Sequence, residues 1–388
     1  MNDWTILLEG GSRVAVAYID YTRAFDSVSH VKLLHKLKSY GISGRLLDFI
    51  EFYLHNRTHS TRVGSNLSSS ARIRSGVVQG SCLGPILFVL FINDIVDKLN
   101  NSTTAKLYAD DLKLYASINV DGDFQNLQNS LDIVYLWSLE WQLTISYHKC
   151  CIVIIDGNLR RVFNSDHFIF KLDTNILECK PAARDLGVII DNRLTFSNHI
   201  AEITKKAHQR TNLIFRCFHS NDVSTLLKAF TTYVRPILEY NSQIWSPITH
   251  HDIFKIEQVQ KQFTKRLYGL STLTYLERLN FLNLDSLELR RLRSDLIFLY
   301  KIIFCKTGID SKNFVSIQDR QSKNLRSHNY QIKTLYNFHH ARSNRCLFSR
   351  TVSVWNGLPA STSFCSVKTF INSISDNYLL KFCKLDIS

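Results

Sequence analysis

The sequence contains no apolar stretch that could cross a bilayer. Its longest, Ile86 to Ile92, is far shorter than the roughly 20 residues that a spanning helix needs. The N-terminus also lacks the basic-then-apolar pattern of a secretory signal. We therefore expect a soluble intracellular protein without a membrane partner, in either the nucleus or the cytoplasm.

Paired cysteine motifs and internal repeats are also missing. The nine cysteines are scattered, and no two are spaced as a CxxC pair. This spacing favours neither a disulfide framework nor a zinc site, so we expect free thiols that are mostly buried. The absence of a repeat argues against a solenoid or a propeller.

Apolar residues make up 45% of the chain, which allows a sizeable core. The net charge of +14 is unevenly distributed. Residues 1–200 hold 20 Lys and Arg against 20 Asp and Glu, whereas residues 201–388 hold 27 against 13. A neutral half followed by a basic half indicates a polyanionic partner for the second half or, alternatively, a solvated basic surface.

The spacing of apolar residues predicts strands in the first half and helices in the second. A hairpin is expected around 64–70, and residues 306–345 read as a linker or loosely packed region. The Trp355 to Pro359 turn should precede a last short helix. The expected strands are 14–20, two within 105–116, 151–155 and several within 168–190. The expected helices lie within 29–56 and at 86–99, 123–142, 199–219, 223–240, 251–269 and 285–305.

Two adjacent acids, Asp110 and Asp111, lie among apolar residues, and Asp20 ends an apolar strand. Neighbouring buried carboxylates repel unless a cation offsets their charge. Oxygen ligands at strand ends suit Mg²⁺, and two such ions can support an in-line displacement at phosphorus. An ordinary turn also favours Asp, so the pair alone decides nothing.

Five segments together resemble the reverse transcriptases of non-LTR, LINE-type retrotransposons, especially jockey-like elements. They share the order and similar spacing of the family motifs. The segments are Tyr18 to His30 (YIDYTRAFDSVSH), Gly76 to Phe88 (GVVQGSCLGPILF), Tyr108 to Asp111 (YADD), Trp137 to Cys150, and Asp185 to Asp191 (DLGVIID).

This resemblance implies an RNA-directed DNA polymerase that transfers nucleotides to a primer 3′-hydroxyl. Its partners would be an RNA template, a DNA primer and deoxynucleoside triphosphates. Asp20, Asp110 and Asp111 would be the catalytic carboxylates that bind two Mg²⁺ ions. Lys149 would protonate the leaving pyrophosphate, unless it is only a solvated lysine.

The resemblance assigns nucleotide and primer binding to further residues of the same motifs. Tyr21 would contribute through its backbone, and Gln79 and Gly80 would line the nucleotide and template side. Phe25 would exclude a ribose 2′-hydroxyl by steric clash, unless it is an ordinary core ring. Tyr108 would pack near the primer end.

Three further positions are expected to have structural roles. Asp26 and Asp191 should act in turns or caps, and Arg235-Pro236 should shape a helix end.

The implied fold class is α+β, a right-hand polymerase palm with an antiparallel sheet and packed helices, followed by an all-helical thumb-like region. The basic helices 199–269 would hold the template–primer duplex through its phosphates. The expected divisions are a partial palm at 1–160, primer-grip-like strands at 161–200, the thumb-like region at 201–305 and a basic C-terminal region at 306–388.

The family pattern further implies a fingers subdomain and an endonuclease before the palm, and the chain reads as truncated in front of both. We therefore expect weak or no polymerisation by this chain alone. The alternative function is a catalytically inactive or domesticated remnant that binds nucleic acid. A metal nuclease would need a cluster of acids and histidines that the sequence does not contain.

Overall fold

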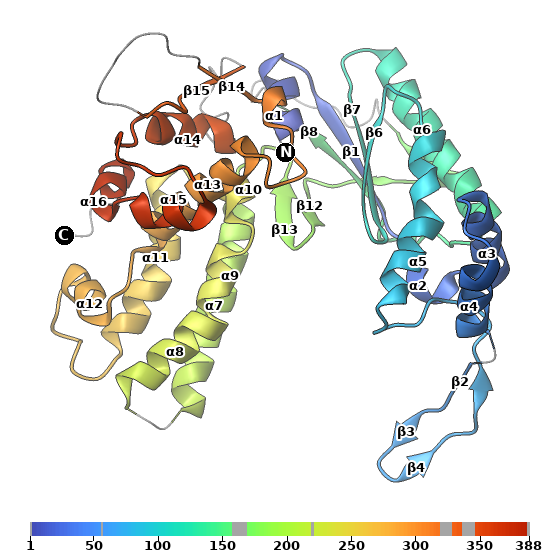
Figure 1. Ribbon diagram of the computed structural model, residues 1–388, viewed down its shortest axis with the longest axis horizontal. Helices are drawn as coiled ribbons and strands as arrows, with labels where there is room; N and C mark the ends of the chain where they lie inside the picture. The colour runs from blue at the N-terminus through green and yellow to red at the C-terminus, as the bar shows by residue number, and fades with distance from the viewer. Residues whose placement is uncertain are drawn as a thin grey trace. The chain divides into compact units, whose positions relative to one another are not determined.

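The computed structural model describes residues 2–55, 57–156, 169–218, 221–318, 328–335 and 346–385 (Figure 1). The chain forms two compact units, which are described separately. One contains residues 11–183, here called the sheet unit. The other contains residues 1–10 and 184–388, here called the helical unit.

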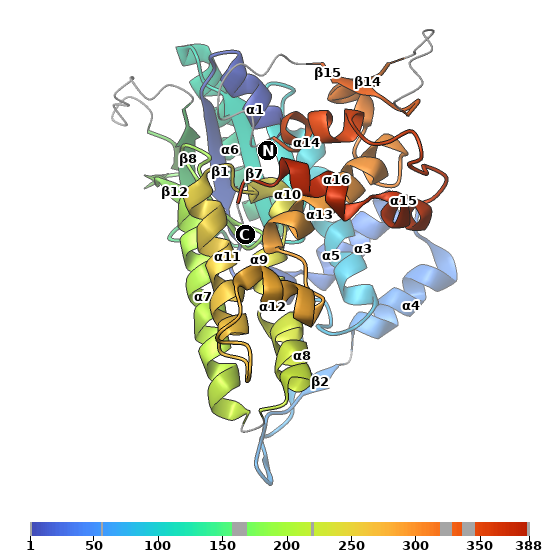
Figure 2. The same cartoon turned by 90° about the vertical axis from the view of Figure 1, so that its left-hand side faces the viewer.

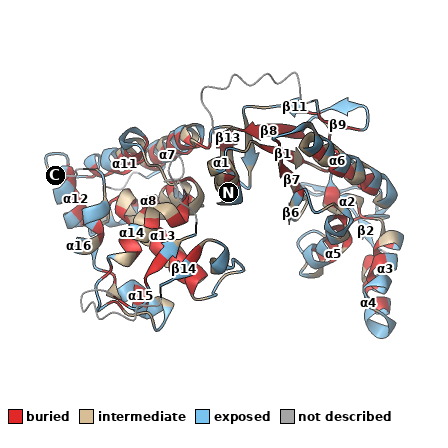
Figure 3. Ribbon diagram, turned by 90° about the horizontal axis from the view of Figure 1, so that it is seen from above, coloured by how far each residue is buried: buried red, intermediate tan, exposed pale blue. Residues whose placement is uncertain are grey.

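The sheet unit is built on a five-stranded sheet of order β11-β8-β1-β7-β6. The central strand pairs antiparallel with both neighbours, and only β11 runs parallel to its partner. The alternation of Val and Ala in β1 suits a strand covered on both faces, and Figure 3 shows β1 and β8 mostly buried. The five strands are β1 (Val14–Ile19), β6 (Thr104–Tyr108), β7 (Asp111–Ser117), β8 (Cys151–Ile155) and β11 (Glu178–Cys179).

Helices cover one face of this sheet (Figure 1). Ala15, Ala17 and Ile19 point to that face and share one core with Phe88 and Leu131 of the helices. The core therefore fixes which face of β1 is covered. The helices are α2 (Ala24–Ser27), α3 (His30–Ser39), α4 (Gly44–Leu54), α5 (Leu83–Ile92), the 3-10 helix η1 (Asn93–Lys98) and α6 (Asp121–Trp141).

Short hairpins complete the sheet unit. One of them projects from the end of α4, away from the sheet (Figures 1 and 2). Its outer pair is β2 (Thr58–His59) with β5 (Ala71–Arg72), and its inner pair is β3 (Arg62–Val63) with β4 (Asn66–Leu67). A second hairpin pairs β9 (Lys171–Leu172) with β10 (Asn175–Ile176).

The helical unit contains α1 and all of the later helices, with α7 and α11 side by side (Figures 1 and 2). Two hairpins belong with it, β12 (Ala182–Asp185) with β13 (Val188–Asp191), and β14 (Val315–Ile317) with β15 (Ile332–Thr334). The helices are α1 (Asn2–Glu9), α7 (Ser197–Cys217), α8 (Val223–Tyr233), α9 (Arg235–Glu239), α10 (Ser242–Trp245), α11 (His250–Lys265), α12 (Tyr275–Leu282), α13 (Leu287–Ile303), η3 (Ser311–Asn313), α14 (Leu347–Asn356), α15 (Val367–Ser373), α16 (Asp376–Leu379) and η5 (Leu380–Phe382).

The C-terminal part packs on α13. Tyr300 stacks on Phe370 with ring centroids 4.6 Å apart, and Trp355 is fully buried in the same core. Val315 and Ile332 of the β14–β15 hairpin also belong to this core. The expectation of a loosely packed linker is therefore wrong for these strands, because their apolar residues meet α13 and α14. Residues 319–327 and 336–345 of that stretch lie outside the described residues.

Most expected elements are present, but the short helices α1, α2 and α10 were not expected. Three further differences concern the later helices. The helix expected at 223–240 is two helices, because Arg235-Pro236 begins α9 after a break at Val234. Helix α12 was not expected, nor was α14 before the Trp355 to Pro359 turn. The mixed α and β composition with a mainly antiparallel sheet agrees with the predicted fold class. The predicted domain boundary at residue 160 lies outside the described residues. Among the described helices none is long and apolar enough to span a membrane.

Candidate active site

Strand register brings two of the three predicted carboxylates together. Ile19 is paired with Leu112 across β1 and β7, so Asp20 and Asp111 occupy the next position along the same ladder. Ile19 and Leu112 point into the core beneath the helices. Because side chains alternate along a strand, Asp20 and Asp111 point to the opposite face of the sheet.

Asp110 lies in the two-residue turn between β6 and β7, where Tyr108 pairs with Asp111. Ala109 begins this turn with φ of 53°, in the left-handed region that an alanine rarely adopts. Such a conformation persists only where the surrounding structure holds it. Tyr108 is 67% exposed at the end of β6. The turn thus presents Tyr108, Asp110 and Asp111 within one hairpin.

Lys149 reaches the same place from the other side of β1. After α6 the chain runs beside residues 20–22, with the Ser146 N–H donating to the Asp20 carbonyl at 2.8 Å. A turn then leads into β8, and Lys149 Nζ donates to Asp20 Oδ1 at 3.2 Å. Next to it, burial raises the pKa of the Cys150 thiol to about 11. Asp20 therefore lies between Asp111, at the start of one neighbouring strand, and Lys149, in the turn before the other.

The donor set fits a hard divalent cation, since all three side chains offer carboxylate oxygens at strand ends or a turn. In the part of the chain that the structure describes, however, no three acidic, histidine or cysteine side chains already converge as a metal-binding cluster. Mutual repulsion between carboxylates opposes such convergence when no cation offsets their charge. Strand register places Asp20 beside Asp111, and Lys149 supplies positive charge at Asp20.

The residues after Asp20 extend this site along the chain. The Tyr21 side chain is 2% exposed and lies in the core, while its backbone bridges to Ile145. Burial raises the pKa of Tyr21, so its hydroxyl stays protonated. Phe25 is partly buried and stacks on Phe88, with ring centroids 4.1 Å apart. Both rings are anchored, and the predicted nucleotide contacts of Tyr21 and Phe25 remain predictions.

The predicted nucleotide-binding loop is tied to the same segment. Gln79 Nε2 donates to Asp26 Oδ1 at 2.7 Å, which agrees with a structural role for Asp26. Gly76, at φ of 90°, passes so close to Asp26 that a Cβ would lie 2.8 Å from its backbone. Gly80 adopts φ of 79° in the turn before α5, with open space around it. The sequence predicted a role for Gln79 and Gly80 but missed Gly76.

A second missed residue is His30. Its ring is 5% exposed, and Nε2 lies 2.8 Å from the Gly76 carbonyl, which joins the first motif to the second. The signal was present, because His30 closes the first motif. The capping role expected of Asp191 is confirmed by its four accepted hydrogen bonds, two of them at 3.0 Å from the backbone N–H groups of Arg193 and Thr195.

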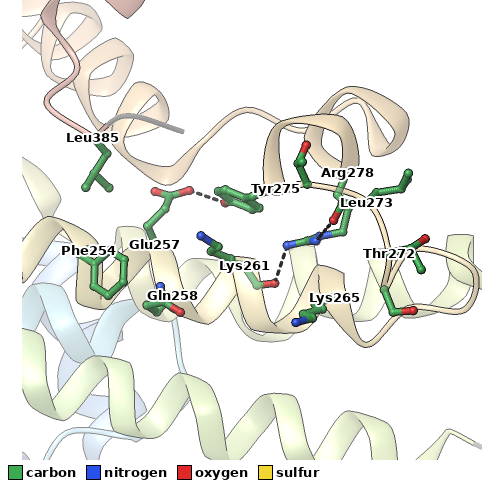
Figure 4. Close-up of a pocket in the computed structure, with 12 residues that line it drawn as sticks. Phe254, Glu257, Gln258, Lys261, Lys265, Thr272, Leu273, Tyr275, Arg278 and Leu385 are labelled. Atoms are coloured by element: carbon green, nitrogen blue, oxygen red, sulfur yellow. Dashed lines mark hydrogen bonds between the residues drawn. The ribbon is translucent and has the colours of Figure 1, made fainter. Parts of the chain in front are cut away.

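A pocket of ≈ 420 Å³ opens in the helical unit between α11 and α12 (Figure 4). Glu257 accepts a hydrogen bond from the Tyr275 hydroxyl there, and burial raises the pKa of this carboxyl. Lys261 and Lys265 line the rim. None of the predicted site residues lines this pocket.

Comparisons with known proteins agree with the motifs. Residues 5–190 match the family model described as reverse transcriptase (RNA-dependent DNA polymerase). An RNA-directed DNA polymerase from mobile element jockey of Drosophila funebris is 27% identical over 68% of this chain and 29% of its own length.

Residues 5–190 of this chain belong to the reverse transcriptase family. A probable RNA-directed DNA polymerase from transposon BS of Drosophila melanogaster is 28% identical over 63% of this chain and 28% of its own length. The predicted kinship with non-LTR, jockey-like reverse transcriptases is thus confirmed. The chain spans less than a third of the length of these relatives.

Solved reverse transcriptase-like structures resemble the chain more distantly. Apo telomerase from Candida tropicalis aligns with a TM-score of 0.39 and 9% identity, over 75% of this chain and 46% of that one. Likeness at this level is too weak to support an argument about the site.

Proposed function

We propose that the chain carries the catalytic centre of an RNA-directed DNA polymerase, which adds deoxynucleotides to a primer 3′-hydroxyl. One observation supports this above the others: Asp20 directly follows β1 and lies beside Asp111, the first residue of β7, while Asp110 lies in the turn from β6 to β7. Reverse transcriptases generally use divalent metal ions. The sheet unit would be the palm, and the helices from α7 onward would form a thumb-like region.

Asp20, Asp110 and Asp111 would hold two Mg²⁺ ions. When bound, these ions activate the attacking hydroxyl and stabilise charge on the leaving pyrophosphate. They would also supply the positive charge that lets three carboxylates share one site. The register that places Asp20 beside Asp111, with Asp110 next to it in the turn, supports this assignment.

Lys149 holds a proton at Nζ beside Asp20 and could give it to the leaving group. Tyr21 would contribute backbone groups to the triphosphate, and Phe25 would set the limit on sugar size. Gln79 and Gly80 would line the base and template side, with Tyr108 near the primer end.

The nucleic-acid partners would be an RNA template and a DNA primer. The segment 199–269 holds 10 Lys and Arg against 5 Asp and Glu, which suits contact with duplex phosphates. Such contacts are salt-sensitive and largely indifferent to sequence.

Single-nucleotide incorporation tests the proposal. The purified chain in excess over a DNA primer on an RNA template should extend the primer slowly with Mg²⁺. Asp110→Asn should reduce the rate at least ~100-fold, because it removes a metal ligand. Asp48→Asn, an exposed acid on α4, is the matched control and should extend normally.

Two results would count against a polymerase. If primer extension survives Asp110→Asn, the extension activity comes from another site or from a contaminant. Failure of the unchanged chain both to extend and to bind a deoxynucleoside triphosphate in a Mg²⁺-dependent way would favour a catalytically inactive remnant.

A further inference from the structure

The hairpin of residues 57–74, here called the β2–β5 arm, carries positive charge without any compensating acid. Arg57, Arg62, Arg72 and Arg74 are all exposed. No Asp or Glu occurs in the sequence between Glu51 and Asp94. The arm therefore presents four cations on a projecting ribbon (Figure 1).

Several arginines elsewhere in the protein are paired with acids. Arg184, Arg290 and Arg350 each contact a carboxylate at 2.5 to 2.8 Å, as surface and buried arginines commonly do. Within the described residues, the four arginines of the arm have no carboxylate partner. Like-charged groups that repel one another on a narrow ribbon indicate an external anionic partner.

The remaining side chains of the arm suit phosphate contacts. Seven Ser and Thr residues and Asn66 lie on it, all exposed. Hydroxyl, amide and guanidinium groups make most protein contacts with the sugar–phosphate backbone.

The arrangement of the arginines follows from the hairpin pairing. Arg72 pairs with Thr58. Arg72 and Arg74 are two residues apart in extended chain, so they point to the same side. Arg62, nearer the tip, is held by a hydrogen bond from Nε to the Gly64 carbonyl at 3.1 Å. Positive groups therefore run along the length of the arm.

Apolar side chains mark the tip. Val63 is 73% exposed and Leu67 is 67% exposed, on either side of the turn at Gly64. The arm contains no Phe, Tyr or Trp. Proteins that hold single strands rely on aromatic side chains for stacking, whereas an A-form duplex is contacted without stacking, at its phosphates and at the sugars of its wide, shallow minor groove.

We propose that the β2–β5 arm binds a nucleic-acid duplex through its phosphates, with Arg62, Arg72 and Arg74 as the main contacts and Val63 and Leu67 against the groove. The inference extends the proposed function, since the template–primer duplex would be the bound molecule. The base of the arm supports this, because Ser75 Oγ donates to the carbonyl of Asp26 at 2.9 Å, and Gln79 of the predicted nucleotide-binding loop contacts the same residue.

Fluorescence anisotropy with a labelled RNA–DNA hybrid tests the inference, in EDTA so that metal binding plays no part. The variant Arg62→Gln/Arg72→Gln/Arg74→Gln should bind at least ~10-fold more weakly at 100 mM salt. Loss of three phosphate contacts should also reduce the slope of log K against log salt by roughly 2 to 3. Arg57 is left in place because its guanidinium lies over the Tyr53 ring.

Two controls separate the arm from general charge. The triple Arg→Lys variant at the same positions should keep most of the salt slope. Lys38→Gln/Arg45→Gln/Lys171→Gln removes three exposed charges from the same unit off the arm and should weaken binding less than ~3-fold.

Other labelled nucleic acids show which kind of nucleic acid the arm binds. A DNA duplex that binds as well as the hybrid would show recognition of duplex form in general, in keeping with the inference. Equal weakening by the two charge-removing triples, or an arm-dependent preference for single-stranded RNA, would overturn it. If the arm does not bind duplex, Asp110→Asn should still reduce primer extension. If the chain is not a polymerase, the arginine substitutions should still weaken duplex binding, so the two proposals can fail separately.

Discussion

Lys149 donates a hydrogen bond to the carboxylate of Asp20, with Nζ 3.2 Å from Oδ1, although the residues are 129 positions apart in the chain. The Lys149 side chain is 56% exposed and that of Asp20 is 36% exposed. An ion pair this open contributes little to stability, on the order of 0–1 kcal/mol. Its position at the end of β1 is the basis for the proposed role of Lys149 as proton donor.

Replacement of Lys149 tests that role. Lys149→Ala should lower the single-nucleotide incorporation rate roughly 10- to 100-fold through loss of the proton donor, with the melting temperature nearly unchanged. Lys149→Arg keeps the charge but holds its proton too tightly, so it should restore binding more than rate. Rapid-quench incorporation across pH is the measurement. An unchanged rate and pH profile in Lys149→Ala would leave Lys149 as a solvated surface residue.

The proposed role of Phe25 in excluding ribonucleotides can be tested by comparing the incorporation of deoxynucleotides and ribonucleotides. Phe25→Val removes bulk beside Phe88 and should increase the relative incorporation of ribonucleotides at least ~10-fold, because the clash with the 2′-hydroxyl is relieved. If Phe25 is only a core ring, the variant melts at a lower temperature and the discrimination between the two sugars stays as it was.

Two glycines allow a paired test of the nucleotide-binding loop. Gly76→Ala should destabilise the protein by about 2–4 kcal/mol, because the new Cβ meets the Asp26 backbone and the residue has positive φ. Gly80→Ala, with positive φ but open space, should cost only about 1 kcal/mol. Thermal unfolding compares them, and equal losses would mean that the Asp26 contact does not constrain the loop.

His199 predicts an acid-sensitive contribution to stability. Its ring is 3% exposed, with Nδ1 accepting from the Ile189 N–H at 3.3 Å, and burial lowers its pKa to about 4. Between pH 6.5 and 4 the unfolded chain binds a proton that the folded chain does not, so stability falls as pH decreases through that range. The loss at pH 5 should be about 2 kcal/mol relative to pH 7.5.

The measurement is the difference in unfolding between pH 7.5 and pH 5 for the unchanged chain and for His199→Gln. The variant should lose less stability on acidification, because it has no imidazole to protonate. The same acid dependence in both proteins would show that other groups account for it.

The sequence predicted the elements whose apolar pattern is strong. The continuous run at Val14–Ile19 and the helical spacing of 123–142 are independent of distant partners, so both were recognised. The α12 helix was missed because its eight residues depend on a capping box between Thr274 and Glu277 more than on periodicity. The strands β14 and β15 were missed because their apolar residues are few, and they become buried only by packing on α13 and α14.

The site was predicted in part for the same reason. The motif resemblance predicted a role for Asp20, Asp110 and Asp111, and strand register places Asp20 beside Asp111. His30 and Gly76 were missed because each depends on a contact with a segment more than 40 residues away. Single-sequence patterns carry no information on such pairs.

Binding of Mn²⁺, followed by electron paramagnetic resonance in the presence of a deoxynucleoside triphosphate, tests the central claim most directly. Mn²⁺ has the same preference for oxygen ligands as Mg²⁺ and is observable. The unchanged chain and Asp48→Asn should bind it equally, whereas Asp20→Asn, Asp110→Asn and Asp111→Asn should each weaken binding at least ~10-fold. Equal Mn²⁺ affinity in all five proteins would contradict a shared metal site at these three aspartates.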